Sequence, residues 1–126
     1  MKKESLRYTI VFIVFLFTCL FCNWPDFHPE DHMGLEYHWA LDMLFHGSYF
    51  FVSSVVLLFT LSSFIRPLII CLTLWMLAFL LEITQLWIPG RTFTLLDLTS
   101  NTLGISFGWL LFQISKIYKA KNQNVH

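Results

Sequence analysis

Leu68–Ile88, LIICLTLWMLAFLLEITQLWI, is the stretch that decides the fold class, because it is apolar over almost its whole length. A helix that crosses a bilayer needs about 20 predominantly apolar residues. Pro67 precedes the stretch and Pro89 follows it, and proline is common where helices begin or stop. The stretch therefore predicts a membrane-spanning helix, with one carboxyl group, that of Glu82, inside it.

Three further segments have the same character, and they run over about 8–24, 39–65 and 96–118. With 68–88 they predict an all-α fold, a four-helix transmembrane bundle that forms one domain over residues 1–126. A cleaved signal peptide is the alternative for the first segment. We expect a span there, because no small-x-small cleavage site follows it.

The composition favours a membrane protein, since the chain is 56% hydrophobic and 13% charged and contains 14 phenylalanines. Soluble domains average about 25% charged residues, and small ones bury only part of their apolar surface. Net charge is zero and no basic face is evident, which argues against nucleic-acid binding. Cys19 and Cys22 form a C-x-x-C within or beside an apolar run, and we expect them to pack as small hydrophobic residues.

The basic residues predict the orientation of the spans. Seven of the eight would share one side of the membrane: Lys2, Lys3, Arg7, Arg66, Lys116, Lys119 and Lys121. Arg91 alone would lie on the other side. Because Lys and Arg are enriched in cytoplasmic segments, both termini are expected in the cytoplasm.

Polar residues inside the predicted spans are the strongest functional signal. The second, third and fourth spans each carry a pair on one helix face, and the short loop between the last two adds an arginine. With antiparallel spans these side chains reach one layer in the outer leaflet: Asp42, His46, Glu82, Gln85, Arg91, Asp97 and Asn101. A lone charge at the bilayer centre costs about 2.5–3.5 kcal/mol on insertion scales, so we expect the groups to face one another.

Structural roles are the alternative for several of these residues. Thr94 to Asp97 matches a capping box, so Asp97 would cap the fourth helix. Arg91 would be an ordinary loop charge. Asn101 and Gln85 would join helices through hydrogen bonds.

A functional role is expected for Glu82 and His46, because ionisable groups within spans are functional by default. The residues Ser100, Gly104 and Gly108 recur every four positions, and this small-residue stripe predicts a close helix-packing seam.

Histidines 28, 32 and 38 lie beside Glu30 and Asp31 in the first loop. Histidine and carboxylate are ligands for zinc, but the spacing matches no established motif. We therefore expect no metal site and no cofactor.

Four short motifs in this order resemble the VanZ-like family of bacterial membrane proteins: Asp42–His46, Glu82–Gln85, Pro89–Arg91 and Asp97–Gly104. The resemblance covers roughly residues 39–108. One departure is Met43, which stands at a position where the family often has lysine, so the lysine ammonium group is missing from this chain.

The resemblance implies a multi-pass protein of the bacterial cytoplasmic (inner) membrane. The founding member of the family is associated with low-level resistance to the glycopeptide teicoplanin. The implied partner is a membrane lipid, a lipid-linked cell-wall component or a lipoglycopeptide. No settled reaction attaches to the family, so the resemblance assigns no catalytic residue.

An intramembrane enzyme acting on a lipid-linked substrate is the second hypothesis. His46 would be the general base, oriented by Asp42, with Glu82 as acid or metal ligand and Arg91 as anion clamp. Against an enzyme, no nucleophile is evident beside His46, because Ser48 lies on another face.

A proton-coupled transporter is the third hypothesis, with Glu82 and His46 as the relay. Four helices are few for alternating access, so such a protein would form a homo-oligomer, through the Ser100, Gly104 and Gly108 stripe.

Overall fold

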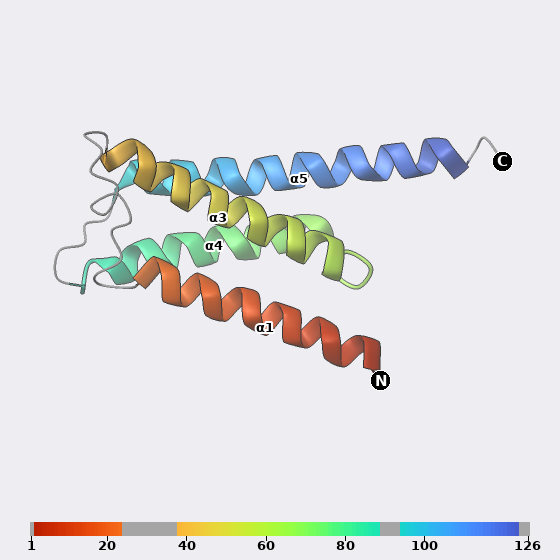
Figure 1. Ribbon diagram of the computed structural model, residues 1–126, viewed down its shortest axis with the longest axis horizontal. Coiled ribbons are helices and arrows are strands. Elements are labelled where there is room, and N and C mark those ends of the chain that lie inside the picture. The colour runs from red at the N-terminus through yellow and green to blue at the C-terminus, as the bar shows by residue number, and fades with distance from the viewer. Residues whose placement is uncertain (1, 24–37, 89–93, 124–126) are drawn as a thin grey trace.

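The computed structural model describes residues 2–23, 38–88 and 94–123. Within these ranges the chain is all-helical, without strands, and its four helices are α1 (Lys2–Asn23), α3 (His38–Leu61), α4 (Pro67–Gln85) and α5 (Leu95–Gln123) (Figure 1). The prediction of an all-α fold with four helices is confirmed for this part of the chain. Two helical stretches, Met43–Leu61 and Pro67–Gln85, are long and apolar enough to cross a membrane.

The helices alternate in direction, as Figure 1 shows. The helices α1 and α4 run one way, while α3 and α5 run the other way. The start of α1 and the end of α5 therefore lie toward the end of the molecule that holds the α3–α4 turn, here called the α3–α4 end. The opposite end, where α4 stops and α5 begins, is called the α4–α5 end.

The helix boundaries differ from the predicted spans by a few residues. The second span was expected to reach residue 65, but α3 ends at Leu61, and the amides of Phe64 and Ile65 both donate to the Leu61 carbonyl in a turn. Arg66 is extended, with φ −57° and ψ 131°, because the ring of Pro67 disfavours the helical region for the residue before it.

The ends of α4 and α5 also differ from the predicted boundaries. The helix α4 stops at Gln85 instead of 88, and the Trp87 amide closes a turn onto the Thr84 carbonyl. The helix α5 continues past 118 to Gln123 and projects beyond the other helices (Figure 1). Its last residues are exposed helix formers, and no glycine or proline interrupts them.

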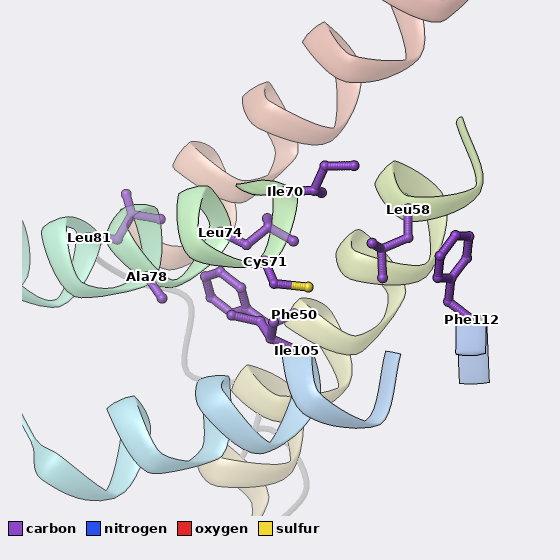
Figure 2. Close-up of a cluster of buried hydrophobic side chains, with 9 residues drawn as sticks. All are labelled: Phe50, Leu58, Ile70, Cys71, Leu74, Ala78, Leu81, Ile105 and Phe112. Carbon is purple, nitrogen blue, oxygen red and sulfur yellow. The ribbon is translucent and has the colours of Figure 1, made fainter. Parts of the chain in front are cut away.

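The apolar core joins α3, α4 and α5, as Figure 2 shows. Its members are Phe50, Leu58, Ile70, Cys71, Leu74, Ala78, Leu81, Ile105 and Phe112. Cys71 belongs to this core and Cys19 packs against it, so both behave as small apolar side chains. The side chain of Cys22 lies outside the described part.

Close packing of α3 against α5 forms the main seam of the molecule. A Cβ on Gly104 would overlap backbone atoms of Gly47 and Phe51, and one on Gly108 would overlap the Ser54 hydroxyl. The Ser100 hydroxyl donates to the Met43 carbonyl across the same seam. The small-residue stripe of α5 therefore packs within the chain, and oligomerisation through it, as the transporter hypothesis requires, would have to displace α3.

The helix α1 is attached to α3 by polar and cationic contacts. The Tyr49 hydroxyl donates to the Thr18 hydroxyl at 2.8 Å, and Thr18 is fully buried. Nearer the start of α1, the Arg7 guanidinium lies 4.4 Å from the centre of the Phe64 ring. These contacts bring the start of α1 beside the α3–α4 turn.

The distribution of polarity is the reverse of that in a soluble protein. Among the side chains that the structure describes, nine polar or charged ones are buried: Thr18, His46, Ser53, Ser54, Glu82, Gln85, Asp97, Ser100 and Asn101. The outward faces carry large apolar side chains, among them Phe12, Leu72, Met76 and Phe107, each more than half exposed. Monomeric soluble proteins rarely expose contiguous apolar surface on this scale.

Candidate functional site

The last turn of α4 supplies two of the predicted site residues. Glu82 and Gln85 are three residues apart, so both side chains fall on one face of the helix. Each is 1% exposed. The face they share therefore points into the bundle near the α4–α5 end.

The first turns of α5 supply two more. The Asp97 amide donates to the Thr94 hydroxyl at 3.1 Å, and that hydroxyl donates in turn to the Asp97 carboxylate. This reciprocal pair satisfies one of the amides that a helix start leaves without a partner. Asp97 is thus engaged at its own helix start, as the capping alternative expects, and Asn101 lies one turn further along.

Three helices meet at the carboxyl group of Glu82. The Asn101 side-chain amide donates to Glu82 Oε1 at 3.1 Å. From α3, His46 Nδ1 approaches the same oxygen at 3.5 Å. His46, Glu82 and Asn101 together are called the Glu82 cluster below.

Burial makes the electrostatics of the Glu82 cluster strong. Asn101 is 1% exposed and His46 8%, so little water screens their interaction with the carboxyl group. Moving an ion out of water costs several kcal/mol unless a partner and further hydrogen bonds offset it. The Asn101 amide provides a hydrogen bond to Glu82, and the His46 imidazole lies 3.5 Å from the same oxygen.

One acceptor in the Glu82 cluster stays open. Asn101 uses its NH₂ group on Glu82, and no hydrogen bond reaches its Oδ1 from the described residues. A buried acceptor without a partner costs about 1–3 kcal/mol. The cluster can therefore accept one more hydrogen bond at the Asn101 Oδ1 atom.

Not every predicted residue joins the Glu82 cluster. Gln85 lies on the same inward face as Glu82, whereas Asp97 is engaged with Thr94. Asp42 lies on α3, one turn before the cluster, but its side chain is outside the described residues. Arg91 lies wholly outside them.

The loop histidines add no described site. Residues 28–32 lie outside the described ranges, and His38 is described only as the first residue of α3. Among the described side chains, no group of three or more His, Cys, Asp or Glu residues is placed to hold a metal ion.

A groove on the outer face of the α3–α5 pair was not anticipated from the sequence. Its volume is about 770 Å³, and apolar side chains such as Leu44, Phe51 and Phe107 line it. Ser48 also lines the groove, away from the buried His46. The signal that could have revealed the groove is the pair of glycines Gly47 and Gly104, which both line it.

The fold and the Glu82 cluster define an all-helical protein with two helices apolar enough to cross a membrane. No protein-family model matches the chain, and neither a curated protein nor a solved structure matches it. The resemblance to the VanZ-like family therefore rests on the four sequence motifs alone.

Proposed function

We propose that this chain is a four-span, VanZ-like integral membrane protein of the bacterial cell envelope. Its Glu82 cluster binds a polar group of a lipid, a lipid-linked cell-wall component or a lipoglycopeptide in the outer leaflet. The observation that carries the proposal is the burial of an acid, an imidazole and an amide from three helices around one carboxylate oxygen.

The reversed polarity of the molecule supports a bilayer as the surroundings. Exposed apolar side chains cover all four helices, with Phe12 on α1, Leu72 on α4 and Phe107 on α5 as examples. In water such a surface would aggregate, whereas acyl chains solvate it at no cost. This favours membrane insertion of α1 and α5 beside the two more apolar helices.

The charges support an orientation with both termini in the cytoplasm. Arg66 lies in the α3–α4 turn, Arg7 packs beside that turn, and Lys116 and Lys119 lie on the last turns of α5. Basic residues gather on the cytoplasmic side of bacterial membrane proteins. The Glu82 cluster, near the opposite end, would then lie in the outer leaflet.

The chemistry of the cluster suits a polar headgroup. Glu82 and Asn101 would orient the ligand by hydrogen bonds, and Arg91 is proposed to meet an anionic part of it. Teicoplanin carries a fatty acyl chain, so a site at the outer membrane surface is physically sensible for this drug. The ligand would keep its chain in the bilayer and its polar group at the cluster.

Reporter fusions test the orientation. A fluorescent protein that matures only in the cytoplasm is expected to be bright when fused after His126 or before Met1. Alkaline phosphatase, which is active only outside, is expected to be active when inserted in the first loop. An active phosphatase at either terminus would refute the four-span topology.

Drug sensitivity tests the ligand. Deletion of the gene is expected to raise sensitivity to teicoplanin more than to vancomycin, and the wild-type gene to restore it. A Glu82→Leu gene should fail to restore it, while Ser106→Ala, an exposed site on α5, should succeed. Unchanged sensitivity to both drugs on deletion would remove the resistance role.

An intramembrane enzyme is the second candidate, and the approach of His46 Nδ1 to Glu82 Oε1 at 3.5 Å favours it. A carboxylate at this distance would stabilise the imidazolium form during proton transfer. If the chain is an enzyme, a His46→Ala variant should lose turnover of lipid-linked substrates. Equal turnover by wild type and variant would exclude His46 as the base.

A further inference from the structure

The open acceptor of Asn101 specifies the kind of group that the Glu82 cluster can bind. The side chain is 1% exposed, and its NH₂ group is committed to Glu82 Oε1 at 3.1 Å. This commitment turns Oδ1 away from the carboxyl group, and no hydrogen bond reaches it from the described residues. A ligand at this position must therefore be a hydrogen-bond donor.

The nearby hydroxyl groups do not supply that donor. The Thr94 hydroxyl donates to Asp97, and the Ser100 hydroxyl donates to the Met43 carbonyl. Both hydroxyls precede Asn101 in the sequence, and both are committed to other acceptors. The donor has to come from outside these side chains.

The local charge favours a cationic donor. Two buried carboxyl groups, those of Glu82 and Asp97, lie near the α4–α5 end. The described Lys and Arg residues belong to the first turns of α1, to the α3–α4 turn or to the last turns of α5. Hydrogen bonds from an ammonium group to acceptors beside a carboxylate are about twice as strong as neutral ones.

We propose that the Glu82 cluster recognises a primary ammonium group, which donates an N–H to Asn101 Oδ1 beside the Glu82 carboxylate. The inference rests on the proposed function and deepens it by naming the ligand class. An amine-bearing phospholipid headgroup and a free lipophilic amine share this chemistry.

A lipid series tests the inference on the wild-type protein. Native mass spectrometry of the full chain in detergent would compare phosphatidylethanolamine, its mono- and dimethyl derivatives, and phosphatidylcholine. Positive charge is kept through the series while N–H donors are lost. Phosphatidylethanolamine is expected to bind about tenfold more tightly than phosphatidylcholine, the scale of one charge-assisted hydrogen bond. Equal binding across the series would overturn the inference.

Substitutions test whether the preference for phosphatidylethanolamine arises at the Glu82 cluster. Asn101→Leu is expected to abolish the preference for phosphatidylethanolamine, and Asn122→Leu, an exposed asparagine on the same helix, is expected to keep it. Far-ultraviolet circular dichroism checks that each variant is helical. A preference that survives in a helical Asn101→Leu variant would refute the role of Oδ1.

Soluble amines separate the two sources. If the ammonium group alone is recognised, dodecylamine should compete with phosphatidylethanolamine and dodecyltrimethylammonium should not. If the phospholipid is required, neither should compete while the lipid series keeps its order. Equal competition by both detergents would refute recognition of N–H donors.

The proposed function and the inference fail in different ways. If phosphatidylethanolamine and phosphatidylcholine bind equally, and Glu82→Leu weakens the binding of both, the Glu82 cluster is a headgroup site without a preference for ammonium groups. The proposed function then stands and the inference fails. Binding of every lipid that Glu82→Leu does not alter would remove the headgroup site itself.

Discussion

Glu82 is the residue on which the polar interior depends, because its Oε1 is approached from two other helices. Asn101 of α5 donates to this oxygen and His46 of α3 lies 3.5 Å from it. A carboxyl group that is 1% exposed needs such partners. The free energy lost when an isolated ion is removed from water is larger than the free energy gained from one weak contact. We therefore expect the stability of the fold to depend on a hydrogen-bond acceptor at position 82 more than on the volume of the side chain there.

Substitution of Glu82 separates those two properties. Glu82→Gln keeps an oxygen acceptor for Asn101, whereas Glu82→Leu leaves the buried amide without it. We expect the leucine variant to be less stable than the glutamine variant by about 1–3 kcal/mol. Unfolding in mixed micelles, followed by tryptophan fluorescence, measures the difference.

Glu4 provides the control for that comparison, since it is an exposed carboxylate on α1. Glu4→Gln and Glu4→Leu are expected to differ by less than about 0.5 kcal/mol, as for ordinary surface changes. If the two Glu82 variants were equally stable, the hydrogen bond from Asn101 would make no measurable contribution to the free energy of unfolding.

At the scale of helices, the α3–α5 seam holds the site together. Gly104 lets the backbone of α5 approach Gly47 and Phe51 of α3 so closely that no Cβ fits. The Ser100 hydroxyl adds a hydrogen bond to the Met43 carbonyl near the start of this seam. The seam sets how α5 is rotated, and that rotation turns Asn101 toward α4.

A single methyl group at Gly104 tests the seam. Alanine is favoured over glycine in a helix by about 1 kcal/mol, so a loose seam would make Gly104→Ala stabilising. We expect the opposite sign, a loss of about 1–3 kcal/mol, because the new Cβ overlaps backbone atoms that cannot rotate away. Ser106→Ala, on an exposed face of α5, is the control and should be near neutral. A gain in stability for Gly104→Ala would contradict the close approach.

At the scale of the whole described molecule, the bundle buries polar side chains beside its apolar core and exposes large apolar side chains on its outer faces. Trp75 lies midway along α4 and is 39% exposed, although its indole N–H donates to Thr102 on α5. Trp87 follows the end of α4 and is 75% exposed. In a bilayer these two rings would lie at different depths, separated by about 18 Å along the helix axis at 1.5 Å per residue.

Brominated lipids measure those depths. Variants that keep either Trp75 or Trp87, with the other tryptophans changed to phenylalanine, would be reconstituted in lipids brominated at known acyl positions. We expect Trp75 to be quenched most by bromine near the chain ends and Trp87 by bromine near the headgroup. Equal quenching of the two, independent of bromine position, would contradict a transmembrane α4.

Helix positions could be predicted from the sequence, but their ends could not be placed to the residue. The apolar run 39–65 overestimated α3 by four residues, because hydropathy does not register the turn that Pro67 imposes on the residues before it. The run 96–118 underestimated α5, since the polar residues after it are also good helix formers. Hydropathy reports the surroundings of a residue, whereas helix ends depend on local backbone constraints.

The amino-acid sequence by itself determined that the described segments are helical and that His46, Glu82 and Asp97 lie on inward faces, because residue spacing and the cost of burying charge depend on side-chain chemistry alone. Tertiary structure alone decided which groups meet. Asn101 and His46 reach Glu82, whereas Asp97 turns back to Thr94. The reason is that helix rotation follows from the contact of Gly104 with α3, and spacing along one helix cannot specify its angle to the next.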